Sequence, residues 1–277
     1  MKLINTKDKQ MNTKMTEHAE SDVLMIFIHG LTGNYLQMHH FQNHFKDKYN
    51  TMSYDLSGRG DSTMQKDPAG IAQHSEDLLE MIESLGYANV ILAGYSMGGY
   101  IAIDVAGRTS KVKKIVLLDG GGEADENTSG LVLPSLGRLE RTFGSRDEYL
   151  EMMKQSYGAM GVEWSEVMDR VIDHEIMQTD GKVTHKSDYG LTKQDFESFY
   201  DFPYDEAYKK VQVPAYLIIC TGPIKDDTAL FSREGYDKML ATIKDIDSTV
   251  KHINHYEIVF NRQEDLNEKI EKFLDEE

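Results

Sequence analysis

The stretch that most constrains the fold lies at residues 90–106. An apolar run at 90–93 breaks into the sequence GYSMGG at 94–99 and resumes as an apolar helical pattern through residue 106. We interpret this stretch as a buried strand, a very tight turn and a helix. The turn matches the pattern G-x-S-x-G, in which small residues on either side of a serine let neighbouring chain segments pass closely while the serine stands at a strained corner. The pattern predicts that Ser96 is presented to a cleft, above the N-terminus of the following helix.

Composition limits the classes of partner. The 277 residues include 30 Lys plus Arg against 47 Asp plus Glu, a formal charge of −17, so nucleic acid and anionic membrane surfaces are poor partners. The single cysteine, Cys220, allows neither an internal disulfide nor a zinc site built on cysteines. Residues 1–22 are polar and charged, without the apolar core of a signal peptide, and no run approaches the length of a transmembrane helix. We expect a cytoplasmic protein.

Strand-like and helix-like segments alternate along much of the chain. Apolar runs at 23–28, 90–93, 115–118 and 213–220 predict buried strands, and 51–56 is interpreted as a shorter, weaker strand. A short last strand is expected at 249–252, and helical patterns occur at 35–49, 71–85, 233–243 and 264–274. Strands separated by helices favour right-handed crossovers. The predicted fold class is therefore α/β, with a mainly parallel twisted sheet flanked by helices.

The rhythm changes after the strand that ends at Asp119. Residues 123–210 contain no clear strand, only helix-like segments such as 146–157 and 162–178. We expect a helical cap at 123–210, inserted into a core formed by 1–122 and 211–277, and covering the carboxyl edge of the sheet. Its larger apolar side chains are expected either to line a pocket or to form the core of the cap itself: Leu131, Leu133, Leu136, Leu139, Phe143, Met152, Met153, Met160 and Trp164.

Four motifs in order make the chain resemble the α/β-hydrolase family, in its capped branch of esterases and lipases. They are HG at 29–30 after an early strand, YDLSGRGDS at 54–62, the turn at 94–98 and a histidine near the C-terminus. The likeness extends over residues 23–274. It implies an α/β-hydrolase fold with the helical cap after the strand ending at Asp119.

The resemblance also implies a catalytic triad in the chain order serine, acid, histidine. Ser96 is the expected nucleophile. His255, in the loop after the last strand, is the expected base, with His252 as the alternative. For the acid that holds and orients the imidazole, the preferred residue is Asp226 after the strand that follows the cap; Asp227 and then Asp119 are the alternatives.

Acyl transfer further requires donors for the developing oxyanion. By resemblance these are the backbone N–H groups of Leu31 and Met97. The side chain of His29 is expected to brace its loop, and Asp55 and Arg59 to organise a turn. His40 and His44 stand four residues apart, a spacing that can bind metal, but no carboxylate in register accompanies them, so we expect no metal site.

We therefore expect a serine hydrolase, most simply a carboxylesterase or lipase-like enzyme that cleaves small to medium acyl esters through an acyl-enzyme and needs no cofactor. A serine rather than an aspartate at the turn disfavours epoxide-hydrolase chemistry, which needs a carboxylate nucleophile. The expected partner is a small ester with an apolar acyl group, and the expected oligomeric state is a monomer or homodimer. Thioester, amide or carbon–carbon bond hydrolysis by the same triad, or ligand binding without turnover, are the alternatives.

Overall fold

An eight-stranded sheet runs through the centre of the molecule in the order β1-β2-β4-β3-β5-β6-β9-β10. The structure, a computed structural model, describes residues 1–276. The strands β4, β3, β5, β6, β9 and β10 are parallel to one another, which confirms the predicted sheet, while β1 and β2 add an antiparallel edge. Their bounds are β1 (Lys2–Asn5), β2 (Gln10–Thr16), β3 (Val23–Ile28), β4 (Asn50–Tyr54), β5 (Asn89–Tyr95), β6 (Val112–Leu118), β9 (Ala215–Cys220) and β10 (Ile246–Lys251).

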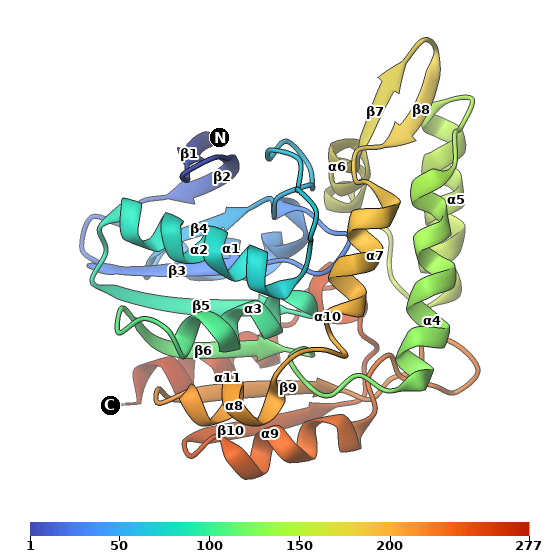
Figure 1. The fold of residues 1–277 in the computed structure, drawn as a ribbon. Helices are drawn as coiled ribbons and strands as arrows, with labels where there is room; N and C mark the ends of the chain where they lie inside the picture. Colours follow the sequence, from blue (N-terminus) through green and yellow to red (C-terminus); the bar gives the residue numbers. More distant parts are fainter. Residues whose placement is uncertain (277) are drawn as a thin grey trace.

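Helices cover both faces of this sheet because its central strands are apolar on both faces. In β3, Leu24, Ile26 and Ile28 enter one hydrophobic core, and Met25 and Phe27 enter the other, as the two-residue period of a strand requires. Figure 1 shows the helices packed along the sheet. The first core is closed by α2 (Ile71–Leu85), α3 (Met97–Ala106), α8 (Tyr204–Lys210) and α9 (Asp237–Thr242); the second is closed by α1 (His39–Phe45), α10 (Glu257–Phe260) and α11 (Glu264–Asp275).

The helices and strands of residues 126–197, which belong to the segment expected to be a cap, stand at one end of the sheet (Figure 1). The expectation of a cap without strands is wrong in one place, because the segment expected to be a helix at 162–178 ends early and a β-hairpin follows. The hairpin turns at Asp180 and Gly181, both with positive φ, as an Asp-Gly hairpin turn requires. The cap elements are α4 (Glu126–Leu136), the 3₁₀ turn η2 (Gly137–Glu140), α5 (Arg146–Ala159), α6 (Glu166–Glu175), β7 (Ile176–Thr179), β8 (Lys182–His185) and α7 (Tyr189–Glu197).

The cap shares its packing with the rest of the chain. Phe196 and Phe199, in and just after α7, belong to the same hydrophobic core as α3, and the rings of Phe199 and Tyr100 stack at 4.5 Å. We propose the division of the chain into a core at 1–122 and 211–277 and a cap at 123–210, with the two parts packed firmly together.

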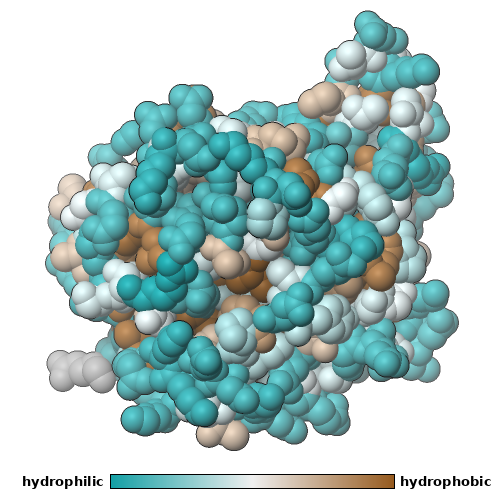
Figure 2. Space-filling model, viewed as in Figure 1, coloured by the Kyte–Doolittle hydropathy of each residue, from teal (hydrophilic) through white to brown (hydrophobic). Residues whose placement is uncertain are grey.

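Hydrophilic residues cover most of the face shown in Figure 2, and hydrophobic side chains show through in separate small areas. Among the helices of residues 1–276, none combines the length and the apolar character that crossing a bilayer requires.

Candidate active site

Ser96 stands at the corner between β5 and α3. Its backbone has φ 53° and ψ −118°, a conformation that costs a residue with a side chain on the order of 1–3 kcal/mol. The corner is tight because a Cβ atom at Gly94 would clash with the Gly98 carbonyl, and one at Gly98 would clash with the Ile28 carbonyl. Only glycines therefore let β5, the turn and the end of β3 approach this closely. As a result the serine is held at the carboxyl end of the sheet.

His255 lies in the loop between β10 and α10 and is paired with Asp119. The imidazole Nδ1 lies 2.7 Å from Asp119 Oδ2, and the exposed fractions of the two residues are 3% and 1%. Asp119 Oδ1 accepts hydrogen bonds from the Cys220 amide at 3.0 Å and from the Tyr236 hydroxyl at 2.9 Å. With the carboxylate held on both oxygens, the Nδ1–H tautomer of His255 is favoured, which leaves Nε2 with its lone pair.

The predicted position of Asp226 beside the histidine is wrong. Asp226 and Asp227 are exposed, in a tight turn that bridges Lys225 to Thr228, and their side chains make no hydrogen bond within residues 1–276. The carboxylate that reaches His255 is Asp119, the last of the three alternatives. It does so because β6 and β9 are neighbours in the sheet, so that the ends of both strands meet below the histidine loop.

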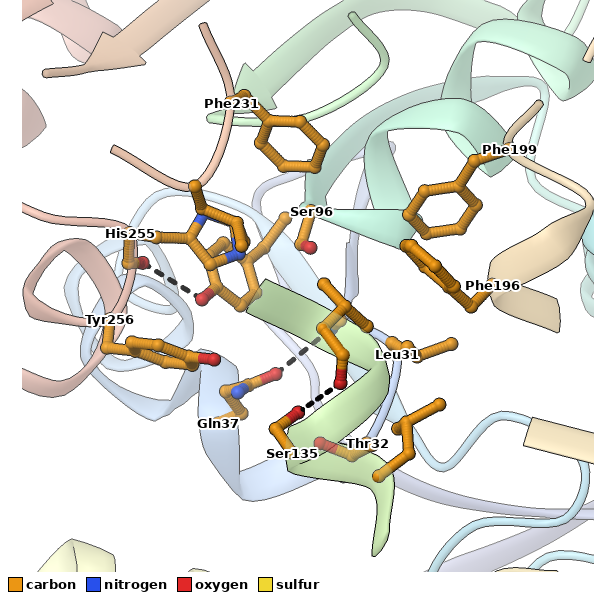
Figure 3. Close-up of a pocket in the computed structure, with 15 residues that line it drawn as sticks. Leu31, Thr32, Gln37, Ser96, Ser135, Phe196, Phe199, Phe231, His255 and Tyr256 are labelled. Carbon is orange, nitrogen blue, oxygen red and sulfur yellow. Dashed lines mark hydrogen bonds between the residues drawn. The ribbon is translucent and has the colours of Figure 1, made fainter. Parts of the chain in front are cut away.

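The structure also separates the two candidate histidines. His252 is exposed, its Nδ1 lies 3.4 Å from Thr221 Oγ1, and it does not line the cavity that Ser96 lines. His255 instead lines one small cavity together with Ser96 (Figure 3). Its ring stacks on Tyr95, whose hydroxyl donates to the His255 carbonyl at 2.9 Å. No hydrogen bond links Ser96 Oγ to His255 in the described part of the chain, and in sites without substrate such bonds are often long and tighten only when substrate is bound.

Two backbone amides near Ser96 have no hydrogen-bond acceptor among residues 1–276. The N–H of Met97 is the first of α3 and so has no partner within the helix. Residues 1–276 supply no hydrogen-bond acceptor for this amide or for the amide of Leu31. Leu31 and Ser96 both line the cavity, and Met97 directly follows the serine. These two amides are the donors expected from the sequence for an oxyanion.

Side chains behind residues 30–31 hold this loop in place. His29 Nδ1 donates to the Gly30 carbonyl at 2.7 Å and His29 Nε2 accepts from the Leu56 amide at 3.0 Å, while Gln37 accepts from the Gly30 amide at 3.0 Å. Complete burial lowers the pKa of His29 to about 4, so the ring is neutral at neutral pH. His29 therefore braces the loop, as expected. Sequence reasoning did not single out Gln37, and no motif marks it.

Arg59 links this loop to the cap. Its Nε donates to the Leu31 carbonyl at 2.8 Å, and its Nη2 pairs with Asp195 of α7 at 2.6 Å. Asp195 also lies 3.2 Å from His74 Nε2 and accepts from Gln65 at 2.7 Å. Burial would raise the pKa of Asp195, but the interactions with His74 and Arg59 outweigh it and lower that pKa below its usual range, so the carboxylate stays charged.

The cavity at Ser96 is small, about 50 Å³, and aromatic residues crowd it (Figure 3). Phe196 and Phe199 come from the cap, and Phe231 lies edge-on to His255 at 5.5 Å. Of the apolar cap residues expected to line a pocket, Leu136 lines this cavity, and Met152, Met153 and Met160 line a second one beside it, whereas Leu139 and Phe143 are buried in hydrophobic cores.

The paired histidines of α1 do not converge on a common point. His40 Nε2 lies 3.2 Å from the Phe260 carbonyl, and His44 Nε2 lies 2.9 Å from Glu271. Within residues 1–276 no cluster of three His, Cys, Asp or Glu side chains is placed to hold a metal ion.

A parallel sheet with a serine on the strand–helix corner defines a class of hydrolase folds, and comparisons agree with this class. A sequence model described as "alpha/beta hydrolase fold" matches residues 23–151. A solved structure of E-2-(acetamidomethylene)succinate hydrolase superposes with a TM-score of 0.87 over 99% of this chain and 98% of the other, at 17% identity. The chain therefore has the α/β-hydrolase fold, and its similarity to that family's sequence model covers residues 23–151, a little under half of its length.

Curated relatives are similar over part of their length. A 3-hydroxybutyrate-oligomer hydrolase of Cupriavidus necator is 28% identical over 163 residues, which are 57% of this chain and 56% of that protein. An (E)-2-((N-methylformamido)methylene)succinate hydrolase of Acinetobacter baylyi is 31% identical over 124 residues, 42% of this chain and 45% of that protein. The matches thus span about half of the length of these relatives.

Proposed function

We propose that this chain is a serine hydrolase that cleaves carboxylic esters through an acyl-enzyme, with Ser96 as nucleophile, His255 as general base and Asp119 as the acid that orients it. The observation that carries the proposal is the contact of 2.7 Å between His255 Nδ1 and Asp119 Oδ2 beside the cavity that Ser96 lines. A serine hydroxyl is a weak nucleophile until a base accepts its proton, and an imidazole with a free Nε2 can do so near neutral pH.

The proposed reaction has two halves. Ser96 Oγ attacks the carbonyl carbon while His255 Nε2 takes the hydroxyl proton, and the resulting oxyanion accepts hydrogen bonds from the amides of Leu31 and Met97. The imidazolium, stabilised by Asp119, gives its proton to the leaving oxygen as the carbon–oxygen bond breaks. Water then attacks the acyl-enzyme by the same route, releasing the acid and restoring Ser96. These steps need no cofactor.

An active-site probe tests this proposal directly. A fluorophosphonate should label the wild-type protein at Ser96, and the protein should hydrolyse short aryl esters such as the acetate and butyrate. The Ser96→Ala variant should lose both properties while keeping its fold by circular dichroism. Absence of labelling in folded wild-type protein, or hydrolysis that survives in Ser96→Ala, would contradict the proposed nucleophile.

An amide is the second candidate for the bond. Two of the similar proteins described above are named hydrolases of amido derivatives of methylenesuccinate. The same serine, histidine and aspartate can cleave an amide, because His255 would protonate the departing nitrogen as it protonates an oxygen. Rates for an ester and an anilide with one acyl group separate the two candidates: an anilide rate equal to or above the ester rate favours the amide.

The remaining expectations about the enzyme stay proposals. The phenylalanines around Ser96 support a substrate whose reacting end carries a small apolar group. A cytoplasmic location and a monomeric or homodimeric state are proposed from composition alone.

A further inference from the structure

A larger cavity of about 560 Å³ opens beside the small one at Ser96. The two share Thr32, Ser135 and Tyr256 in their linings, so the cavities adjoin each other. The larger cavity is lined by twelve residues, including three methionines and two tyrosines, and among them are Arg138 and Arg141 but no acidic residue. In a chain of net charge −17, a cavity that holds two cations and no acid is set apart electrostatically.

Arg138 is the more confined of the two arginines. Its Nη1 donates to the Ser135 carbonyl at 3.1 Å and its Nη2 donates to Thr32 Oγ1 at 2.9 Å. Its Nε is buried and has no hydrogen-bond partner. A guanidinium offers five N–H donors, so most of them remain without an acceptor from residues 1–276.

The charge of Arg138 is not neutralised by direct pairing. No carboxylate of residues 1–276 lies within 4.0 Å of its guanidinium nitrogens. The buried acid of the neighbourhood, Glu175, already accepts from the Tyr149 hydroxyl at 2.8 Å and lies 3.6 Å from His185 Nε2. Burial would lower the pKa of Arg138, but the interactions with Tyr149 and Glu175 outweigh it and raise that pKa, so the guanidinium stays charged. Because no carboxylate pairs with it directly, its free N–H groups are suited to bind an anion in the cavity.

Resting on the proposed hydrolase function, we propose that the substrate carries a carboxylate, which Arg138 binds while the scissile carbonyl lies at Ser96. The planar guanidinium matches a carboxylate through paired hydrogen bonds. The connection to the reacting end runs through Thr32, which accepts from Arg138 and directly follows Leu31, the proposed oxyanion donor. A monoester of a short dicarboxylic acid, in which the carboxylate and the scissile carbonyl are a few bonds apart, is the simplest substrate of this kind.

Two isosteric esters test this specificity. Monoethyl succinate and ethyl levulinate have the same length and shape, but the first ends in a carboxylate and the second in a methyl ketone. We expect kcat/KM of the wild-type protein to favour monoethyl succinate at least tenfold. Arg138→Gln should lower this ratio by roughly ten- to hundredfold, since hydrogen bonds to charged groups are worth that much, and Arg138→Lys should give an intermediate ratio.

Controls separate binding of the carboxylate from other effects. Arg146→Gln removes the same charge from the cap at an exposed position, where Arg146 pairs with Asp173 at 3.0 Å, and should leave the ratio unchanged. If Arg138 only supported the structure, its replacement would slow both esters equally, and an unchanged ratio would overturn the proposal.

A binding measurement gives an answer without turnover. By calorimetry the Ser96→Ala protein should bind monoethyl succinate at least tenfold more tightly than ethyl levulinate, and the Ser96→Ala/Arg138→Gln double variant should lose this difference. Equal binding of the two esters to Ser96→Ala would show the carboxylate site to be wrong even if the protein hydrolyses both. Selective binding together with no hydrolysis and no labelling of Ser96 would overturn the proposed function and leave the carboxylate site standing.

Discussion

Replacing Asp119 by asparagine should abolish most of the proposed activity while changing almost no atoms. In the folded protein Oδ1 of Asp119 accepts from the Cys220 amide and the Tyr236 hydroxyl, so the asparagine carbonyl oxygen is needed at that position. Its NH₂ group then occupies the place of Oδ2, 2.7 Å from His255 Nδ1. Because an amide NH₂ only donates, His255 must carry its proton on Nε2, and that tautomer cannot accept the proton of Ser96.

The expected loss is large because it combines a wrong tautomer with a lost charge. An equivalent aspartate-to-asparagine change in a serine protease triad lowers kcat about 10⁴-fold, which corresponds to about 5 kcal/mol of transition-state stabilisation. The hydrogen bonds to Cys220 and Tyr236 are retained, so the free energy of unfolding should fall by no more than about 1–3 kcal/mol, the cost of one disrupted buried hydrogen bond.

The assay is the kcat/KM for an aryl ester, accompanied by the rate of fluorophosphonate labelling at Ser96 and by urea denaturation. Asp226→Asn is the matched control, because it makes the same chemical change on an exposed turn, and it should keep wild-type kinetics. A near-wild-type rate in folded Asp119→Asn, or a loss of a hundredfold or more in Asp226→Asn, would refute this assignment of the acid.

Three further changes probe the scaffold. Lys9→Met removes the partner of Asp77, a buried pair at 2.7 Å, and should lower the free energy of unfolding by about 3–5 kcal/mol in urea titrations, with a loss under 1 kcal/mol counting against the pair. His29 has a pKa of about 4 in the folded protein and 6.5 in the unfolded chain, so the unfolded state binds more protons between these two pH values. The free energy of unfolding that His29 contributes above pH 6.5 should therefore fall by about 3 kcal/mol as the pH drops through 4. In His29→Gln the slope of unfolding free energy against pH over this range should be shallower, and an unchanged slope would exclude this source. Ser96→Gly relieves the strained φ of 53° and should raise the unfolding free energy by roughly 1 kcal/mol, after the entropic cost of glycine, whereas Ser96→Ala should not.

Structural features that depend on residues close together in the sequence could be predicted from it. The corner at Ser96 depends on Gly94 and Gly98, which lie two residues away, and the structure has the strand, turn and helix that this spacing predicts. The parallel sheet also follows from local patterns, because an apolar run needs burial on both faces. The β7–β8 hairpin was predictable in principle, since Asp180-Gly181 is a strong turn signal, but the helical pattern before it dominated the interpretation.

Features that depend on distant contacts could not be assigned in the same way. Asp119 and His255 are 136 residues apart, and they meet because β9, which follows the cap, pairs with β6. The sequence contains no record of that pairing, so three aspartates near strand ends remained candidates and the ranking that preferred Asp226 could not be checked. Arg138 posed the same difficulty, because its neighbours Thr32 and Tyr256 come from opposite ends of the chain.

The guanidinium of Arg59 binds two parts of the molecule at once. It donates to the Leu31 carbonyl on one side and pairs with Asp195 of α7 on the other. Swinging α7 outward to admit a ligand would pull on the peptide that follows the Gly30–Leu31 loop and disturb the amide meant for the oxyanion. Ligand entry and catalysis would then require different positions of α7. The Leu31 amide would be correctly placed for the oxyanion only after α7 had returned to the position seen in the structure.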